Sequence, residues 1–211
     1  VSTKILETPT SIEGWIRSQR RTITWQRDGV EAPVALLNND GLSFIVNGKS
    51  DGCAVSDAAT QVMSGLLGAM LHPAPKKALV IGLGTGSTAG WLAQVPGIER
   101  VDVMEIEPVI VEVARQMTAV NRDVLNNPRV NLLIGDAREL LAVSREKYDI
   151  VFSEPSNPYR ISIANLYTRE AYQAVVERLE EGGLFIQFLQ AYEVDGEAVR
   201  TAYATLGSVF G

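Results

Sequence analysis

The stretch ALVIGLGTGSTAGWLAQ, residues 78–94, joins an apolar segment to a segment with helical spacing through a turn rich in glycine. The apolar run ends at Gly82, and Gly84 and Gly86 follow at alternating positions. Glycine allows the tight backbone of such a turn and lets a ligand come close to the main chain. The pattern therefore predicts a strand, a glycine turn and a helix that together bind a nucleotide-like ligand. A purely steric use of the glycines is the alternative at this point, because many strand-to-helix turns need them.

Strand-like and helix-like patterns alternate from this turn to the end of the chain. We expect strands at residues 77–82, 100–106, 129–135, 148–154 and 183–192, and helices at residues 87–95, 108–120, 137–143, 168–180 and 195–206. The strands are almost continuously apolar, which is typical of a parallel sheet covered by helices on both faces. We therefore predict an α/β fold with a doubly wound, mostly parallel sheet, whose ligands bind at the carboxyl ends of the strands.

The N-terminal quarter of the chain has a different composition. Short β-prone runs are separated by Asp-Gly, Asn-Asp-Gly and Asn-Gly signals, which predict hairpins, and a helical pattern follows at residues 54–71. We therefore expect a small β-rich hairpin subdomain at residues 1–53 and a Rossmann-like nucleoside-binding domain at residues 54–211. The chain starts at Val1 without an initiator methionine, and the last two strands usual for such a sheet are missing. We accordingly expect a piece of a longer protein, truncated at its C-terminus.

Charge and residue usage limit the chemistry. The net charge of −6 disfavours a nucleic-acid partner, whose phosphates it would repel, and favours a small cationic partner. Cys53 and His72 are the only cysteine and the only histidine, which argues against metal clusters and against Cys/His or Ser/His catalysis. We therefore expect no metal, and acid–base chemistry must use carboxylates, tyrosines or lysines.

Acidic residues stand at the ends of the second and third predicted strands of the α/β layer. Glu105 stands 23 positions after Gly82, where a carboxylate can accept hydrogen bonds from both hydroxyls of a ribose. Asp136 ends the next strand, where it can read an adenine edge or cap the following helix. The turn reads GxGxG rather than GxGxxG, so its third glycine stands one place too early for a dinucleotide site. These features favour a sulfonium nucleoside and a fold of the class I S-adenosylmethionine-dependent methyltransferase type.

Glu154 closes the predicted apolar strand YDIVFSE and is followed by Pro155 and Pro158. An ammonium group is not a nucleophile, so amine transfer needs a group that removes a proton from it. A partly desolvated carboxylate can orient the ammonium and take that proton, which makes Glu154 a candidate general base. The alternative is an acid that only caps a local turn.

Five segments together resemble the spermidine synthase family, the polyamine aminopropyltransferases. They are KALVIGLGTGST, RVDVMEIEPVIVEVAR, NPRVNLLIGDAREL, YDIVFSEPSNP and NLYTREAYQAVVERLEEGGLF, and the likeness covers roughly residues 40–190. The sequence is most similar to a divergent branch that is often fused to membrane transporter-like segments. The resemblance implies decarboxylated S-adenosylmethionine as donor, an amine as acceptor and methylthioadenosine as product.

The resemblance also implies roles for individual residues. The donor would be held by Gly82, Gly84, Thr85 and Gly86 of the turn, by Glu105 and Ile106, and by Asp136 and Ala137 at the adenine. Glu154 matches the family's catalytic aspartate and Asn157 the second acid of the same loop, while Asp57, Tyr159 and Gln190 are candidates for contacts with the acceptor.

The sequence departs from the family pattern at the polar groups that bind amines. Thr85 replaces an aspartate that binds the donor's amine, and Asn157 replaces a charged acid. Residues 62–64 read Val-Met-Ser where the family carries a tyrosine-containing motif that holds the acceptor. Donor binding survives these changes better than acceptor binding, so the acceptor stays open.

Two other functions remain as alternatives. Ser156–Tyr159 faintly resembles the Asn-Pro-Pro-Tyr loop of methyltransferases that act on planar amines, so a methyltransferase using intact S-adenosylmethionine is one. A non-catalytic nucleoside-binding domain is the other. We further expect a cytoplasmic location, with tethering to a membrane through segments outside this chain and assembly into a homodimer as open alternatives.

Overall fold

The computed structural model describes residues 14, 22–38, 41–156, 158–191 and 194–210. Within these residues, the N-terminal part is an antiparallel sheet in the order β1-β2-β3-β4. Its strands are β1 (Ile23–Asp28), β2 (Pro33–Asn38), β3 (Leu42–Val46) and β4 (Lys49–Cys53). Asn47 and Gly48 turn β3 into β4 with φ angles of 51° and 80°, which an Asn-Gly hairpin turn requires. The β-rich N-terminal part predicted from the sequence is therefore confirmed.

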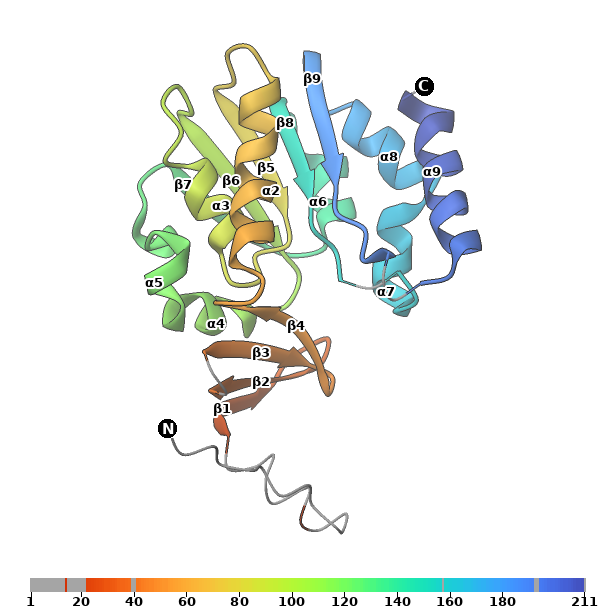
Figure 1. Cartoon of the computed structure of the whole chain (residues 1–211). Helices are drawn as coiled ribbons and strands as arrows, with labels where there is room; N and C mark the ends of the chain where they lie inside the picture. Colours follow the sequence, from red (N-terminus) through yellow and green to blue (C-terminus); the bar gives the residue numbers. More distant parts are fainter. Residues whose placement is uncertain (1–13, 15–21, 39–40, 157, 192–193, 211) are drawn as a thin grey trace, which may run out of the picture.

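A parallel sheet in the order β7-β6-β5-β8-β9 follows in the described part of the chain (Figure 1). Its strands are β5 (Lys77–Ile81), β6 (Arg100–Glu105), β7 (Val130–Ile134), β8 (Tyr148–Ser153) and β9 (Leu179–Gln187). The chain moves outward from β5 to β7 and then returns to the other side of β5 with β8. This reversal places a topological switch point between β5 and β8, where ligands of such sheets bind. The α/β fold class predicted from the sequence is confirmed.

Helices cover both faces of the parallel sheet. One face carries α2 (Ala58–Leu71), α3 (Ser87–Leu92), α4 (Ile110–Gln116), α5 (Thr118–Asn121) and the 3-10 helix η1 (Val124–Asn126). The other carries α6 (Ala137–Val143), α8 (Arg169–Val176) and α9 (Gly196–Phe210), while α7 (Ile161–Ala164) and η2 (Asn165–Tyr167) lead from β8 into α8. Side chains of β5 point alternately to the two faces of the sheet, so Val80 is buried in the core under the first group of helices and Leu79 in the core under the second.

The two sheets share part of their core. Val34, Leu36 and Phe44 of the N-terminal sheet are buried in the same apolar cluster as Val80 of β5. Figure 1 shows the N-terminal sheet below the parallel sheet. Because burial of apolar side chains is a main stabilising contribution, this shared cluster fixes the small sheet against the site at the switch point.

The predicted elements near the C-terminus need correction. The helix expected at residues 168–180 ends at Val176, and the strand expected at residues 183–192 is β9, which begins at Leu179. Gly182 has a φ of 76°, and the register between β8 and β9 shifts beside it, so the glycines form an irregularity inside the strand. Gln190 therefore lies beyond β9 and not at its end.

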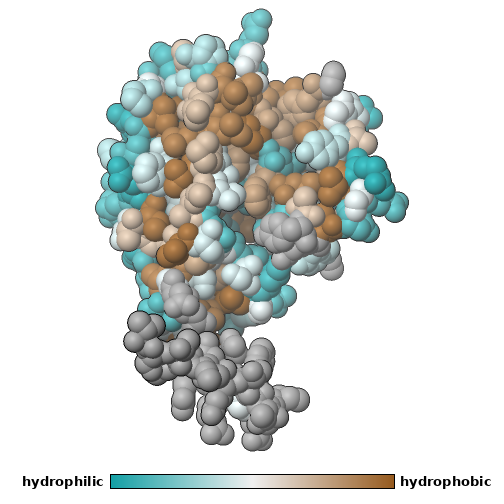
Figure 2. All heavy atoms as spheres, viewed as in Figure 1, coloured by the Kyte–Doolittle hydropathy of each residue, from teal (hydrophilic) through white to brown (hydrophobic). Residues whose placement is uncertain are grey.

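Helix α2 packs through small residues rather than large apolar ones. A Cβ atom on Gly65 would lie 2.3 Å from the carbonyl oxygen of Thr88, so glycine is what lets α2 lie so close to α3. Met70 and Leu71 are 71% and 65% exposed, and Figure 2 shows apolar side chains gathered on the outer surface of this region. Among the described residues, none of the helices combines the length and the apolar composition that a membrane span requires.

Candidate active site

A cavity of about 800 Å³ lies at the carboxyl ends of β5, β6 and β8, between the parallel sheet and the N-terminal sheet. Its volume is typical of sites for small molecules and cofactors. The predicted residues that line it are Asp57, Gly82, Gly84, Thr85, Glu105, Ile106, Asp136, Ala137, Glu154, Tyr159 and Gln190. Gly86 lies at the start of α3, and Asn157 falls outside the described residues.

The glycine turn takes a backbone conformation that other residues rarely adopt. Gly82, Gly84 and Gly86 have φ angles of 98°, 52° and 81°. A Cβ atom on Gly82 would lie 2.9 Å from the carbonyl oxygen of Glu154, so a side chain there would meet the backbone of the next strand end. These glycines are therefore required by the close approach of β5 to the end of β8 and by the positive φ angles.

Glu105 is buried at the end of β6 and binds two backbone N–H groups. Its Oε2 accepts from the N–H of Leu83 at 2.8 Å, and its Oε1 accepts from the N–H of Glu107 at 2.9 Å. Burial raises the pKa of Glu105, and these two hydrogen bonds act against that rise. The carboxylate therefore fixes the glycine turn, and each oxygen keeps a second lone pair for a ribose hydroxyl.

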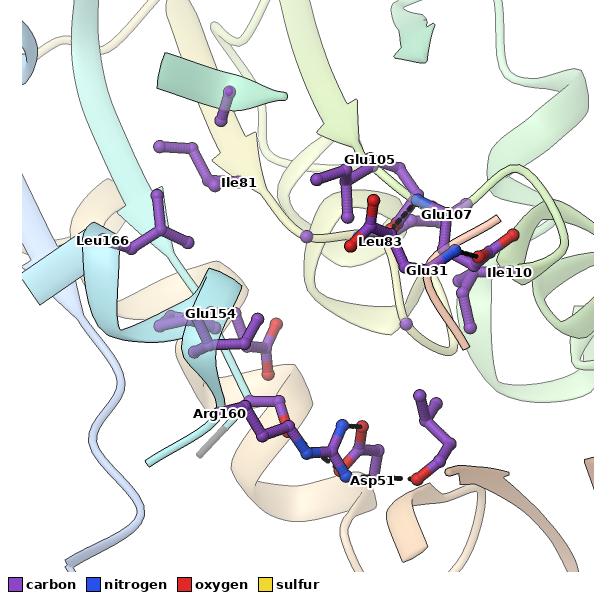
Figure 3. A pocket seen from close by; sticks show the side chains of 18 of the residues that line it. Glu31, Asp51, Ile81, Leu83, Glu105, Glu107, Ile110, Glu154, Arg160 and Leu166 are labelled. Carbon is purple, nitrogen blue, oxygen red and sulfur yellow. Dashed lines mark hydrogen bonds and ion pairs between the residues drawn. The ribbon is translucent and has the colours of Figure 1, made fainter. Parts of the chain in front are cut away.

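Glu107 is a buried carboxylate that the sequence analysis missed. Its Oε1 accepts from the N–H of Val109 at 3.0 Å, and its Oε2 accepts from the N–H of Glu31 at 2.7 Å. A Cβ atom on Gly29 would lie 2.6 Å from the backbone carbonyl oxygen of Ala32 and 2.3 Å from Oε2 of Glu107, so glycine suits this turn between β1 and β2. Glu107 thus joins the N-terminal sheet to the loop after β6, on the same side of the cavity as Glu105 (Figure 3).

Asp136 caps α6, as one of the two sequence interpretations proposed. Its Oδ1 accepts from the backbone N–H of Arg138 at 2.9 Å, and its carboxylate forms an ion pair with the Arg138 guanidinium. The hydrogen bond with this guanidinium lowers the pKa of Asp136. Asp136 still lines the cavity beside Ile106 and Ala137, so its contact with adenine stays a prediction.

Glu154 follows β8 and has very different surroundings. Its N–H donates to the carbonyl of Ile81 at 2.9 Å, which holds the loop after β8 beside the end of β5. The hydroxyl of Thr88 donates to Oε2 of Glu154 at 2.6 Å. Burial raises the pKa of Glu154 to about 7, and the Thr88 hydrogen bond acts against that rise. A carboxyl group with this pKa can gain and lose a proton at neutral pH.

Thr85 of the glycine turn forms a neutral polar cluster with Gln61 and Ser87. Its hydroxyl donates to Oε1 of Gln61 at 2.5 Å and lies 2.9 Å from the hydroxyl oxygen of Ser87. Thr85 is only 3% exposed. Gln61 comes from α2, and the sequence analysis missed it because it stands 24 positions earlier in the chain. The site therefore holds uncharged groups where the resemblance inferred from the sequence implies an aspartate.

An ion pair connects the loop after β8 to β4. The Arg160 guanidinium lies 2.9 Å from Oδ2 of Asp51, and the hydroxyl of Ser156 donates to Oδ1 of Asp51 at 2.9 Å. Arg160 also donates to the carbonyl of Val46 at 3.1 Å. Figure 3 shows this pair near Glu154, across the cavity from Glu105. No local sequence pattern indicates the Asp51 contact, because its partners lie more than 100 positions away.

The predicted acceptor residues line the cavity from three different segments of the chain. Asp57 accepts from the N–H of Cys53 at 2.7 Å, Tyr159 is 59% exposed, and Gln190 is 8% exposed. The Nζ of Lys49 donates to the Tyr159 hydroxyl at 3.0 Å. Among the described residues, no group of three or more His, Cys, Asp or Glu side chains could hold a metal ion.

Comparison with known proteins gives one family. The family model described as spermine/spermidine synthase domain matches residues 58–211. The polyamine aminopropyltransferase of Nitrosomonas europaea is 32% identical over 146 residues, which are 69% of this chain and 45% of that protein. Putrescine N-methyltransferase 2 of Nicotiana attenuata is 31% identical over 139 residues, which are 65% of this chain and 37% of that protein. The chain thus spans less than half the length of these two relatives.

Solved structures show the same fold. A spermidine synthase in complex with the transition state analogue AdoDATO has a TM-score of 0.83 at 22% identity and covers 89% of this chain, which in turn covers 65% of that structure. The spermidine synthase of Thermotoga maritima has a TM-score of 0.80 at 22% identity, with 89% of this chain and 64% of that structure covered. The resemblance inferred from the sequence is confirmed at the level of the family, whereas the transporter-fused branch stays a prediction. The chain belongs to the spermine/spermidine synthase family.

Proposed function

We propose that this chain forms the active site of an aminopropyltransferase that uses decarboxylated S-adenosylmethionine and a small amine, with Glu154 as the general base. The observation that carries the proposal is the carboxyl of Glu154, which is held beside the glycine turn in the cavity with a pKa of about 7. At neutral pH such a carboxyl group is partly ionised, and its ionised form is basic enough to remove a proton from the acceptor amine.

The residues of this chain contribute to the reaction in two ways: they position the acceptor and the donor, and Glu154 removes a proton from the acceptor. The carboxylate of Glu154 binds the acceptor ammonium and takes one proton, which leaves a neutral amine with a free lone pair. The donor supplies an electrophilic carbon: the amine nitrogen bonds to it, the carbon–sulfur bond breaks, and its electron pair stays on sulfur. The product leaves as a secondary ammonium ion, and Glu154 returns its proton to water. The cavity aligns the two reactants and excludes water.

The charge of the cavity favours the decarboxylated donor over the intact one. Its described lining includes the carboxylates of Glu31, Asp51, Asp57, Glu105, Glu107, Asp136 and Glu154. The two arginines in that lining are both paired with a carboxylate, Arg138 with Asp136 and Arg160 with Asp51. An excess of negative charge attracts a sulfonium with a free ammonium and repels the carboxylate that intact S-adenosylmethionine carries.

Methyl transfer from intact S-adenosylmethionine is the second candidate. One relative is a putrescine N-methyltransferase, and it matches almost as well as the aminopropyltransferases do. The neutral pair of Thr85 and Gln61 also lacks a carboxylate that would prefer a free ammonium on the donor. Both reactions need the same removal of a proton from the acceptor, so they differ in the donor and not in the role of Glu154.

The deciding experiment is product analysis by mass spectrometry with each donor and with putrescine, 1,3-diaminopropane and spermidine as acceptors. An aminopropyl adduct supports the proposal, and a methyl adduct supports the second candidate. Glu154→Gln should lower turnover by ~100-fold or more, because general-base catalysis contributes factors of this size. Binding of methylthioadenosine, measured by calorimetry, should be retained.

Glu180→Gln is the matched control, since Glu180 is exposed on β9 and does not line the cavity. It should turn over at the wild-type rate. A Glu154→Gln enzyme that keeps the wild-type rate would rule out Glu154 as the base.

A further inference from the structure

The hydroxyl of Thr88 lies between two acceptors. Its oxygen is 2.6 Å from Oε2 of Glu154 and 3.3 Å from the backbone carbonyl oxygen of Gln61. Thr88 is 3% exposed, in the first turn of α3, directly after the glycine turn. This hydroxyl thus connects the candidate base to helix α2.

A hydroxyl has one proton to donate and two lone pairs to accept with, so it can serve both forms of a carboxyl group. When Glu154 is ionised, the Thr88 hydroxyl donates its proton to Oε2. When Glu154 is protonated, the carboxyl O–H donates to the oxygen of Thr88, and the Thr88 proton turns to the Gln61 carbonyl. Both arrangements use the same heavy-atom positions.

We propose that Thr88 is a positioning residue that holds the carboxyl group of Glu154 in one place before and after it takes a proton from the acceptor. The inference rests on the proposed role of Glu154 as base. Without this hydroxyl, the protonated carboxyl would lose its acceptor, and the ionised carboxylate would lose a donor in a desolvated site.

The packing of α2 against α3 makes the hydrogen bond from the Thr88 hydroxyl to the Gln61 carbonyl possible. The carbonyl of Gln61 comes close to the Thr88 hydroxyl because α2 and α3 touch at Gly65, where a Cβ atom would lie 2.3 Å from the Thr88 carbonyl oxygen. Gly65 therefore positions the acceptor that the Thr88 proton needs when Glu154 is protonated.

The neighbouring charges have partners of their own. Asp51 on β4 forms an ion pair with Arg160 in the loop after β8. Asp57, before α2, accepts from one backbone N–H group, and Glu105, at the end of β6, accepts from two. The pKa of Glu154 is raised by burial and lowered by Thr88, so the Thr88 hydroxyl is the polar contact whose loss should move it.

The test compares Thr88→Val, which keeps the shape of the side chain, with Thr88→Ser, which keeps the hydroxyl. The pH profile of kcat/KM is measured for each, together with the pKa of Glu154 from ¹³C NMR of glutamate-labelled enzyme. Thr88→Val should move the acidic limb and the NMR midpoint upward by about one pH unit, because a hydrogen bond to the charged form lowers a carboxyl pKa. It should also lower kcat by about 10-fold, within the range for a misplaced catalytic group. Thr88→Ser should keep both the midpoint and kcat at their wild-type values.

Thr24→Val is the control, since it removes a hydroxyl that donates to the carbonyl of Leu36 in the N-terminal sheet, away from Glu154. Its pH profile should match that of the wild type. If Thr88→Val does not fold by circular dichroism, Thr88→Ala should show the same shift. An unchanged midpoint and rate in the folded variant overturns the role of Thr88. Wild-type turnover by Glu154→Gln would instead overturn the proposed function, so the two failures are distinguishable.

Discussion

The carboxylates at the ends of β6 and β8 have equivalent places in the fold but very different partners. Glu105 accepts hydrogen bonds from two backbone N–H groups, whereas Glu154 accepts one from the hydroxyl of Thr88. A backbone N–H can only donate, so it favours the ionised form, but a hydroxyl can adapt to either form. Burial raises the pKa of both carboxyl groups, so the contrast lies in their partners: Glu105 holds the backbone of the glycine turn, and Glu154 has one partner that suits either protonation state.

Replacing Glu105 with alanine should have the largest effect on stability. It would leave the buried N–H groups of Leu83 and Glu107 without their acceptor, at a cost of about 1–3 kcal/mol each. We expect a loss of about 2–6 kcal/mol in the free energy of unfolding, measured with urea, and weaker binding of methylthioadenosine because the glycine turn is no longer fixed.

Glu105→Gln is the graded control for this prediction. Its amide oxygen can still accept one of the two N–H groups, but its NH₂ group faces the other donor, so the loss should be smaller than with alanine. Wild-type stability and nucleoside affinity in Glu105→Ala would show that Glu105 does not hold the turn, and the contrast with Glu154 would fail.

The second prediction concerns the pH dependence of stability. The pKa of Glu154 is raised from 4.5 to about 7 in the folded protein, so the folded state keeps this proton between those pH values while the unfolded chain has lost it. The free energy of unfolding should therefore fall as pH rises through this window, by about 3 kcal/mol from this group alone. In Glu154→Gln this decrease should be absent.

Urea denaturation of the wild type and of Glu154→Gln at pH 4, 6 and 8 measures the difference directly. The glutamine variant should gain stability relative to the wild type as pH rises, although it has lost turnover. Parallel curves for the two proteins would mean that Glu154 has an ordinary pKa, and its role as base at neutral pH would lose its main support.

The sequence could predict the strand ends but not what binds to them. Glu105, Asp136 and Glu154 each follow a continuous apolar run, and the α/β pattern alone brings such positions to one edge of the sheet. The cap formed by Asp136 was also predictable, since its partner is two residues away. Local patterns of this kind depend on neighbouring residues, which a sequence displays directly.

The contacts that close the cavity could not be predicted, because they join distant segments. Glu107 reaches Glu31 across 76 positions, and Arg160 reaches Asp51 across 109. Each contact depends on how the N-terminal sheet packs against the parallel sheet, and a single sequence carries no record of that packing. Gly65 is a partial exception: a glycine inside a predicted helix indicates a close approach, but not to which neighbour.

The smallest expected effect concerns Asp136, the carboxylate after β7. Arg138 forms its ion pair with Asp136 at the surface, with 42% of its side chain exposed, and exposed pairs contribute about 1 kcal/mol or less. Arg138→Ala should therefore lower the free energy of unfolding by less than about 1 kcal/mol at pH 7, since the backbone N–H at position 138 still donates to the cap.

The pKa of Asp136 is lowered by this pair, so the stabilisation is present above the ordinary pKa of an aspartate and is lost as pH falls through the lowered value. The difference between Arg138→Ala and the wild type should consequently vanish in acid and shrink in high salt, as measured by urea denaturation. Asp136→Ala should cost more, about 1 kcal/mol further, because it removes the cap itself. Equal losses in the two variants would mean that the guanidinium and not the cap fixes the start of α6, and the carboxylate after β7 would then hold its backbone less directly than Glu105 does.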